Sequence, residues 1–195
     1  MTMRPRNGYF LLFGLAAALA SPAMAGVEKP VELSAVPASV MEVAKTNVVD
    51  LKVASGGDAA MNADDDSVVD DDGIVAAYEI LGDVNFVSAN TETEEDGSYV
   101  FEIQGTFADG RKIEIDIFPD GEVEEIEIEF KLADVPGAIL KAIERKLPGF
   151  KHEFIEASHN DAKKVTGYEF VGMMGETKMD IEVSADGRNI VVSDQ

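Results

Sequence analysis

Residues 112–130 have the sequence KIEIDIFPDGEVEEIEIEF, in which apolar and acidic residues alternate on both sides of a central turn. Side chains point alternately to the two faces of a β-strand, so this period of two predicts strands with one apolar and one acidic face. Asp120-Gly121 is a dipeptide typical of hairpin turns. The stretch therefore predicts antiparallel strands that pack their apolar face in a core and leave their acidic face in water.

Similar segments return later in the chain and predict further strands. Residues 179–183 (MDIEV) repeat the alternation 66 positions after 113–117 (IEIDI), and an Asp-Gly turn follows each of them. Self-similarity of this kind indicates a repeated structural unit. The matched segments are 84–89 with 152–157, 99–103 with 168–171 at a spacing of 69, and 113–117 with 179–183, with turns at 120–121 and 186–187.

Two amphipathic segments precede these strands and predict one helix each. Val36-Pro37 and Val135-Pro136, 99 residues apart, place proline in the first helical turn, where its missing N–H is tolerated. Apolar residues then recur at helical spacing. The sequence therefore predicts an α+β fold of two tandem units, each a helix packed on a four-stranded antiparallel sheet, within residues 26–130 and 131–195. The units are expected either to share a helix–sheet interface or to continue one sheet.

The first unit is the longer one, because 99 residues separate Val36 from Val135 whereas 61 residues run from Val135 to the end. The extra residues lie between the first helix and its first strand and include the aspartate runs at 64–66 and 70–72. Runs of like charge with little apolar content remain solvated. We expect a flexible acidic insert at about 55–72, followed at 74–81 by either a short helix or an early strand.

The insert also holds the candidate metal ligands. Calcium prefers six to eight oxygen ligands, which aspartates can supply. An EF-hand loop needs Gly at its sixth and Glu at its twelfth position, but counting from Asn62 these positions hold Ser67 and Gly73. A solvated acidic run without a cofactor is therefore the favoured interpretation, and low-affinity calcium binding is the alternative. The candidate ligands are Asp64, Asp66, Asp70 and Asp72.

Residues 1–25 have the pattern of an export signal. Arg4 and Arg6 precede an uncharged apolar run at 9–20, and Ala23-Met24-Ala25 forms a small-x-small cleavage site. The run is shorter than the roughly 20 apolar residues that a membrane-spanning helix needs. We therefore expect cleavage after Ala25, a periplasmic or secreted location, and no membrane span once the signal is removed.

Composition excludes several classes of function. The chain has 38 acidic and 16 basic side chains and a net charge of -22, which argues against nucleic-acid binding because phosphate contacts need clustered Lys and Arg. It contains no cysteine, so thiol catalysis and thiolate metal sites are excluded. Motifs for hydrolases, zinc proteases and phosphate-binding loops are absent, and the two histidines are expected at the surface. We predict that the protein is not an enzyme.

A family resemblance rests on several short motifs. They are the Val-Pro helix starts at 36–37 and 135–136, LPGF at 147–150, Gly-Tyr-x-Phe at 167–170 and Ala-Asp-Gly at 185–187. Together with the order of elements, they resemble the PepSY-like family, which is grouped with β-lactamase-inhibitor-like domains. The resemblance covers residues 131–195 well and 35–130 more loosely. It implies an exported, non-catalytic module, often in tandem, that binds or inhibits other proteins such as peptidases, and it brings no catalytic residues.

The leading expectation is therefore an exported protein-interaction module, inhibitory toward a peptidase or other hydrolase, with a partner that presents a basic surface. Opposite charges would speed the encounter of the two proteins, and salt would weaken this effect. The alternative is an acidic, low-affinity calcium- or cation-binding protein of the cell envelope. The partner-binding candidates on the acidic strand face are Glu114, Asp116, Glu124, Glu127 and Glu129.

Overall fold

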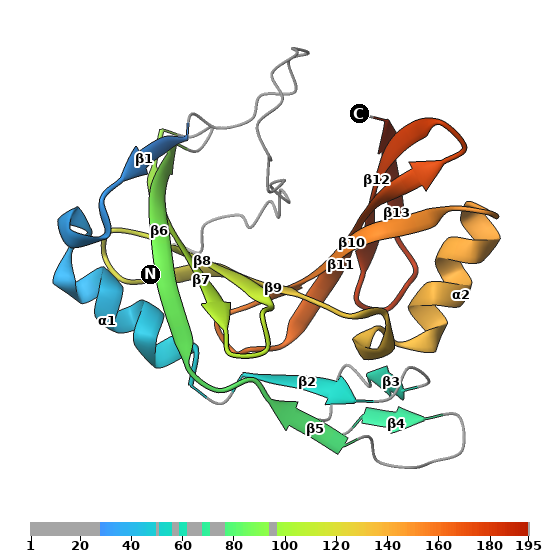
Figure 1. Ribbon diagram of the computed structural model, residues 1–195, viewed down its shortest axis with the longest axis horizontal. Helices are drawn as coiled ribbons and strands as arrows, with labels where there is room; N and C mark the ends of the chain where they lie inside the picture. The colour runs from blue at the N-terminus through green and yellow to red at the C-terminus, as the bar shows by residue number, and fades with distance from the viewer. Residues whose placement is uncertain are drawn as a thin grey trace, which may run out of the picture.

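A single nine-stranded antiparallel sheet forms the centre of the protein (Figure 1). The computed structural model describes residues 28–49, 51–55, 59–61, 68–70, 77–93 and 97–194. The strands lie in the order β1-β6-β7-β8-β9-β10-β11-β12-β13, so that from β6 onward each strand pairs with its successor in this order. Their bounds are β1 Lys29–Val31, β6 Val84–Thr93, β7 Tyr99–Phe107, β8 Lys112–Ile117, β9 Val123–Glu129, β10 Lys151–His159, β11 Val165–Met174, β12 Thr177–Ser184 and β13 Ile190–Asp194.

Two α-helices cover one face of the sheet. It is the face that the alternation of apolar and acidic residues predicts to be apolar. Helix α1 (Ala38–Asn47) and helix α2 (Gly137–Lys146) each start directly after the predicted proline, which confirms both helix positions. A short 3₁₀ turn precedes each of them, η1 (Leu33–Ala35) and η2 (Leu132–Asp134). In Figure 1 strands β6–β9 and β10–β13 diverge as the two arms of a V, with α1 outside one arm and α2 outside the other.

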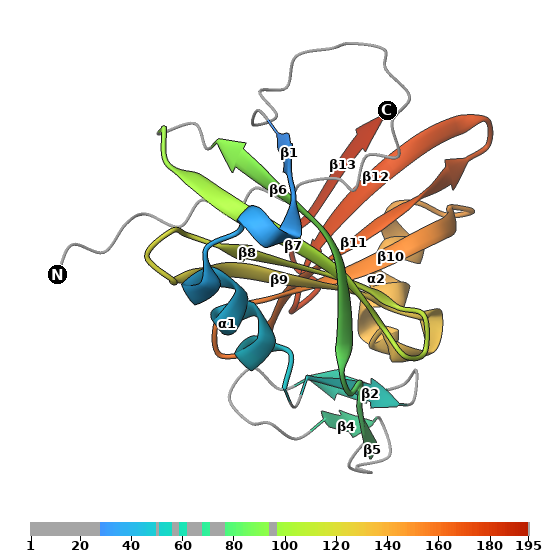
Figure 2. The same ribbon diagram turned by 60° about the vertical axis from the view of Figure 1, so that its left-hand side comes forward.

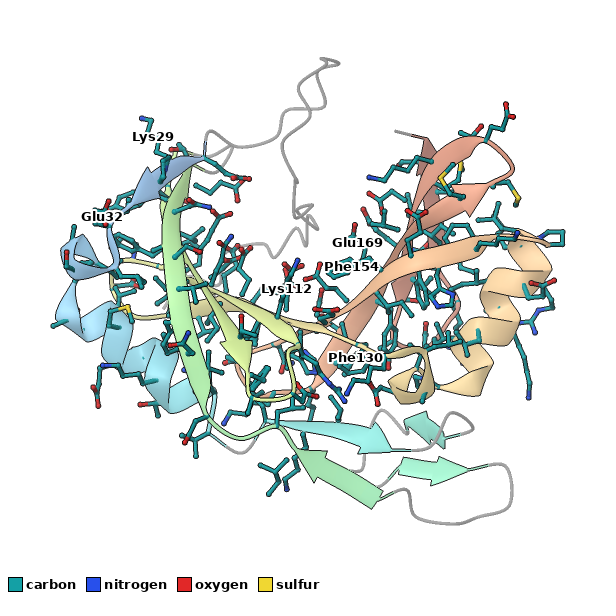
Figure 3. The ribbon with its side chains drawn as sticks, in the orientation of Figure 1. Lys29, Glu32, Lys112, Phe130, Phe154 and Glu169 are labelled. Carbon is teal, nitrogen blue, oxygen red and sulfur yellow. The ribbon has the colours of Figure 1, made fainter. Side chains whose placement is uncertain are left out.

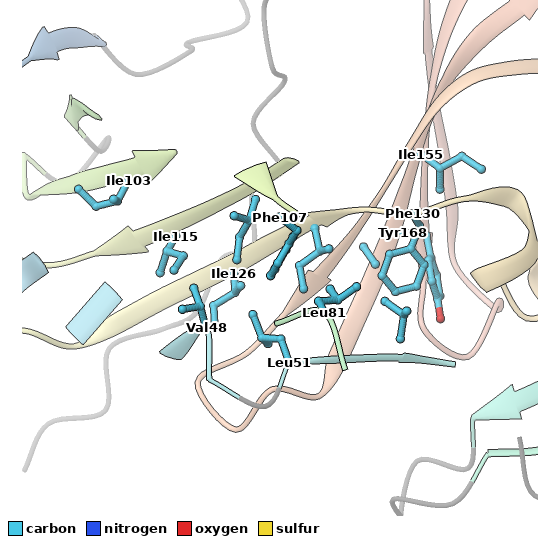
Figure 4. Close-up of a cluster of buried hydrophobic side chains, with 14 of the residues drawn as sticks. Val48, Leu51, Leu81, Ile103, Phe107, Ile115, Ile126, Phe130, Ile155 and Tyr168 are labelled. Carbon is cyan, nitrogen blue, oxygen red and sulfur yellow. The ribbon is translucent and has the colours of Figure 1, made fainter. Parts of the chain in front are cut away.

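The hydrophobic core extends without interruption from one arm to the other. Val40 and Ala44 of α1 and Ile139 and Ile143 of α2 are buried in the same cluster as the isoleucines of β8 and β9. At the centre, Phe130 packs edge-on against Tyr168, with ring centroids 6.0 Å apart. Figure 4 shows side chains of both arms in this cluster, labelled Ile103, Ile115, Ile126, Ile155 and Tyr168 among others. Burial of this apolar surface is the main favourable contribution to folding.

This architecture corrects the predicted fold class. The protein is mainly β, and the expected α+β fold of two units, each a helix on its own four-stranded sheet, is wrong because strands β9 and β10 pair directly. Glu129 lies opposite Glu156 and Ile126 opposite His159 in this ladder. Two separate sheets would have left both strands with unpaired N–H and C=O groups at an edge, whereas one continuous sheet satisfies them. Of the two ways of joining the helix-and-strand segments, continuation of one sheet is the one observed.

The pairing register also corrects how the two arms correspond. In β6 the ladder to β7 shifts between Phe86 and Ser88, and in β10 the ladder to β11 shifts between His152 and Phe154. The residues opposite these bulges are Gly105 and Gly172, which are 67 positions apart. Position 103 therefore corresponds to 170, and the predicted match of 99–103 with 168–171 at a spacing of 69 is displaced by two residues along the strand.

A buried ion pair holds the connection between the arms. Arg111, in the turn between β7 and β8, contacts Asp109 through Nε and Oδ2 at 2.7 Å and Asp134 of η2 at 3.0 Å. The Asp134 carboxylate also accepts a hydrogen bond from the backbone N–H of Lys131 at 2.7 Å. Because Arg111 and Asp134 are both buried, removing either one would leave an uncompensated charge in the interior.

Two small hairpin sheets lie beyond one end of the main sheet in both views (Figures 1 and 2). Strand β2 (Lys52–Ser55) pairs with β5 (Ala77–Ile80), and β3 (Ala59–Met61) pairs with β4 (Val68–Asp70). Strand β5 favours the early strand over the short helix within 74–81. Strands β3 and β4 fall inside the predicted insert at 55–72. Residues 56–58, 62–67, 71 and 72 of the insert lie outside the described residues.

Within the described ranges, neither helix combines the length and apolar character that a membrane span requires.

Candidate functional site

The face of the sheet opposite the helices is lined with carboxylates from β6 to β12. Cross-strand pairs join them in rows: Glu102 faces Asp116, Glu114 faces Glu127, and Glu156 faces Glu169. The reason is the sequence alternation, because each of these acids except Glu92 is followed or preceded by a core residue that points to the other side. We call this surface the acidic sheet face. Its members are Glu92, Glu102, Glu114, Asp116, Glu125, Glu127, Glu129, Glu156, Glu169, Asp180 and Glu182.

Several of these carboxylates are deeply buried. Glu127 is 3% exposed, Glu156 1% and Glu169 2%. Within the described parts of the chain, neither carboxylate oxygen of Glu156 has a hydrogen-bond partner, and the same is true of Oε1 of Glu127, whereas the side chain of Glu169 lies against that of Asp180. Buried acids are ordinarily paired or hydrogen-bonded, since burying an uncompensated charge is costly. These three side chains are therefore the most unusual feature of the sheet.

Burial and crowding change the protonation of these groups. Burial, followed by the charges of Glu114 and Glu129, raises the pKa of Glu156 to about 8, although Lys112 opposes the shift. Burial and the charge of Asp180 raise the pKa of Glu169 to about 9. Burial likewise raises the pKa of Glu127, and the charge of Glu156 adds to the effect. A cation brought to this face would favour the ionised carboxylates and release their protons.

Three of the acids form a compact group at the β7–β8 pair. One carboxylate oxygen from each of Glu102, Glu114 and Asp116 lies within 4.8 Å of the other two. The amide nitrogen of Gln104 donates a 2.7 Å hydrogen bond to Oε2 of Glu114, and the Ser88 hydroxyl donates to the Gln104 amide oxygen at 2.7 Å. This chain of hydrogen bonds orients Glu114 from the neighbouring strands. Among the described residues, this is the one group of three whose ligand atoms lie close enough for a shared metal ion.

An aromatic ring and a lysine lie where the two arms meet. The ammonium of Lys112 is 5.6 Å from the ring centroid of Phe154, a distance typical of a cation–π contact. Figure 3 shows Lys112, Phe154 and Glu169 on the inner side of the V, whereas Phe130 lies toward the helix side. The backbone N–H of Lys112 donates to Oε2 of Glu129 at 3.1 Å. The centre of the acidic sheet face thus combines carboxylates with one aromatic surface.

The structure brings four of the five predicted partner-binding residues together. Glu114, Asp116, Glu127 and Glu129 all lie on the acidic sheet face. Glu124 differs, because Asp116 pairs with Glu125 and Ile117 pairs with Val123, which makes Glu124 the extra residue of a β-bulge. The expectation that this face is wet is wrong for Glu114 and Glu127, which are buried.

The predicted metal ligands of the insert are not brought together in the described structure. Asp64, Asp66 and Asp72 lie outside the described residues, and Asp70 is the last residue of β4. The acidic sheet face, rather than the aspartate runs, is where the described structure gathers carboxylates.

Sequence reasoning also missed one buried histidine. His152 is exposed as expected, but His159 is 2% exposed and its Nδ1 donates to the Ile126 carbonyl at 3.3 Å. Burial lowers the pKa of His159 to about 4, so the ring is neutral at physiological pH. The sequence contains a pattern that indicates this burial, since His159 continues the alternation of the apolar residues Ile155 and Ala157 on β10. Its role is to fill the β9–β10 junction.

Comparisons with protein-family models, with curated proteins and with solved structures found no match to this chain.

Proposed function

We propose that the protein is an exported, non-catalytic interaction module that binds a basic segment of a partner protein on its acidic sheet face. The observation that carries the proposal is the pair Glu156 and Glu169, two buried carboxylates that face each other in adjacent strands, with no basic side chain paired to them and no hydrogen-bond partner for Glu156 in the described chain. Such a pair destabilises the free fold. An incoming guanidinium or ammonium group would supply both the missing hydrogen bonds and the missing charge.

The chemistry of the surroundings favours arginine or lysine on a loop or an extended segment. Glu129, Glu156, Glu169 and Glu182 form a row across four strands, which would bind several cations placed along one segment. Phe154 offers a ring on which a guanidinium can stack. Because charge complementarity acts mainly on the rate of encounter, association should be fast at low salt and slower at high salt.

The remaining features of the proposal come from the sequence. The pattern of residues 1–25 supports export to the periplasm or beyond the cell, with cleavage after Ala25. The short motifs at 147–150, 167–170 and 185–187 support a PepSY-like tandem module, and Gly105 and Gly172 opposite matching bulges add support to the repeat. Inhibition of a peptidase or another hydrolase is the form of binding that this resemblance suggests.

The experiment compares two double variants with the same change in net charge. Glu156→Gln with Glu169→Gln removes the buried pair, whereas Glu144→Gln with Glu176→Gln removes two exposed acids outside the acidic sheet face. A nine-residue arginine peptide is titrated into each protein by calorimetry at low and high salt. We expect the wild type and the exposed-site variant to bind alike and the buried-pair variant to lose at least about tenfold in affinity. Equal binding by all three proteins would contradict the proposal.

A second candidate function, binding of a divalent cation, is favoured by the grouping of Glu102, Glu114 and Asp116. It uses a different part of the acidic sheet face and is developed next.

A further inference from the structure

We propose that Glu102, Glu114 and Asp116 form a binding site for one calcium ion on strands β7 and β8. Glu102 and Asp116 are direct cross-strand partners, and Glu114 is on the same face of β8 as Asp116. Their ligand oxygens all lie within 4.8 Å of one another. Two oxygens bound to one calcium ion at 2.3–2.6 Å are separated by at most about 5 Å, so a single ion can contact all three.

A fourth carboxylate gives independent support for a missing ligand. Glu127 lies directly opposite Glu114 on β9, is 3% exposed, and its Oε1 has no hydrogen-bond partner in the described structure. Directly paired residues on one face of a sheet have Cβ atoms about 4.5–5.5 Å apart, so Glu127 lies beside Glu114. A buried carboxylate oxygen without a donor, next to other acids, must either carry a proton or lie against a cation, and a bound calcium ion would take the place of the proton. Glu127 therefore completes the group as a fourth oxygen donor.

The donor set selects the type of cation. All four side chains offer carboxylate oxygens, and neither histidine nor cysteine is in the group, which argues against zinc and copper. Calcium accepts irregular sets of carboxylate and water ligands, whereas magnesium requires near-ideal octahedral geometry at shorter distances. Carboxylates held at fixed strand positions fit the first requirement better than the second.

The other arm of the sheet provides an internal control. At the corresponding positions it carries Glu169, Asp180 and Glu182, with Glu169 opposite Glu182 as Glu102 is opposite Asp116. The position of Gln104, which donates to Glu114, is occupied there by Val171, which pairs with Asp180 and has no side-chain donor. The second group therefore has the charge of the first but no neutral side chain in the place of Gln104, and within it the acids Glu169 and Asp180 contact each other instead. We infer one calcium ion per chain, at β7–β8.

The test uses the whole protein after treatment with a chelator. Calcium binding is measured by titration calorimetry, and melting is compared in about 5 mM calcium chloride and about 15 mM sodium chloride, which have equal ionic strength. One double variant is Glu114→Gln with Asp116→Asn, and its matched control is Asp180→Asn with Glu182→Gln. A third variant changes Asp64, Asp66, Asp70 and Asp72 to Asn. Glu102→Gln alone repeats the test with a smaller change if the first double variant does not fold.

We expect calcium, but not sodium chloride, to raise the melting temperature of the wild type, with one ion bound per chain. The Glu114/Asp116 variant should bind calcium at least tenfold more weakly, while the Asp180/Glu182 variant and the aspartate-run variant bind it as the wild type does. The inference is overturned if calcium acts no more strongly than sodium chloride, if both sheet variants lose affinity equally, or if only the aspartate-run variant loses it. Loss of arginine-peptide binding in the Glu156/Glu169 variant is measured separately, so failure of one proposal is distinguishable from failure of the other.

Discussion

The arm formed by β6–β9 and the arm formed by β10–β13 carry acids at corresponding strand positions but place them in different surroundings. Around Glu114, Gln104 donates a hydrogen bond at 2.7 Å and is itself held by Ser88. Beside Asp180, the corresponding neighbour is Val171. The same number of charges therefore forms a group oriented by a neutral hydrogen-bond donor in one arm and a group beside an apolar side chain in the other. Neighbouring uncharged residues, more than the acids themselves, distinguish the two arms.

The helices of the two arms also differ, in how many of their residues are buried. Helix α1 buries Val40 and Ala44, whereas α2 buries Gly137, Ile139, Ala142 and Ile143. The last turn of α2 has two basic residues, Arg145 and Lys146, where that of α1 has Lys45, and such residues interact favourably with the helix dipole. The second arm, formed by β10–β13, thus has the helix with more buried residues. We expect mutations in the second arm to have the larger effects on stability.

The largest expected effect tests which core positions correspond between the arms. Phe170→Ala should cost about 3–5 kcal/mol of unfolding free energy and Ile103→Ala about 2–5 kcal/mol, because both side chains are fully buried. Tyr99→Ala should cost less than about 1.5 kcal/mol, since Tyr99 is 43% exposed and contacts Phe101 edge-on. Urea unfolding measures all three. Under the 69-residue correspondence Tyr99 would match Tyr168, which is 1% exposed, so a cost of about 3–5 kcal/mol for Tyr99→Ala would restore that correspondence and break the comparison.

The next effect is the dependence of stability on pH. The folded pKa values of Glu156 and Glu169, about 8 and about 9, lie above the unfolded value near 4.3, so the folded state binds more protons between these limits. Stability should therefore fall as pH rises, by roughly 2–4 kcal/mol between pH 7 and pH 9. His159, with a pKa of about 4, titrates below this window.

A pair of variants relates this pH dependence to the two arms. Burial raises the pKa of Glu114 to about 8, with the Gln104 hydrogen bond opposing the shift, whereas the pKa of Glu169 is about 9. Glu169→Gln should therefore flatten the fall in unfolding free energy more than Glu114→Gln does. Urea unfolding at a series of pH values gives both slopes. A steeper slope in Glu169→Gln than in the wild type would show that the sign of the effect has been assigned wrongly.

A smaller effect is expected at the two bulges. A Cβ added to Gly172 would lie 2.8 Å from the Cα of His152 and still closer to the Lys151 carbonyl oxygen, so backbone would have to move. At Gly105 the closest atom would belong to the Val84 side chain, which can rotate. We expect Gly172→Ala to cost about 3 kcal/mol and Gly105→Ala about 1 kcal/mol, measured by thermal unfolding. The reverse order would mean that the second arm adapts more easily than the first.

The smallest effect concerns a contact between the arms outside the sheet. The ammonium of Lys163, in the β10–β11 turn, donates to the Val49 carbonyl after α1. This contact is exposed, so Lys163→Met should change the unfolding free energy by less than about 1 kcal/mol. A larger loss, measured by urea unfolding, would show that this contact contributes to holding the arms together in addition to the β9–β10 ladder.

Local sequence pattern determined much of this structure. Alternation at 113–117 and 179–183 identified strands and their two faces, Val-Pro pairs marked both helix starts, and Asp-Gly marked two turns. These features depend on residues that are close in the chain, where side-chain periodicity and turn geometry act directly. The grouping of Glu114, Asp116, Glu127 and Glu129 followed from the same periodicity.

Only the tertiary structure decided how these elements combine. Pairing of β9 with β10 merged the expected two sheets, a bulge displaced Glu124, and the ladder opposite Gly105 and Gly172 changed the correspondence of the arms. It also buried His159 and the carboxylates of Glu127, Glu156 and Glu169. Alternation specifies a face but neither the strand that will lie alongside nor the register, because both depend on backbone hydrogen bonds and packing between residues distant in sequence.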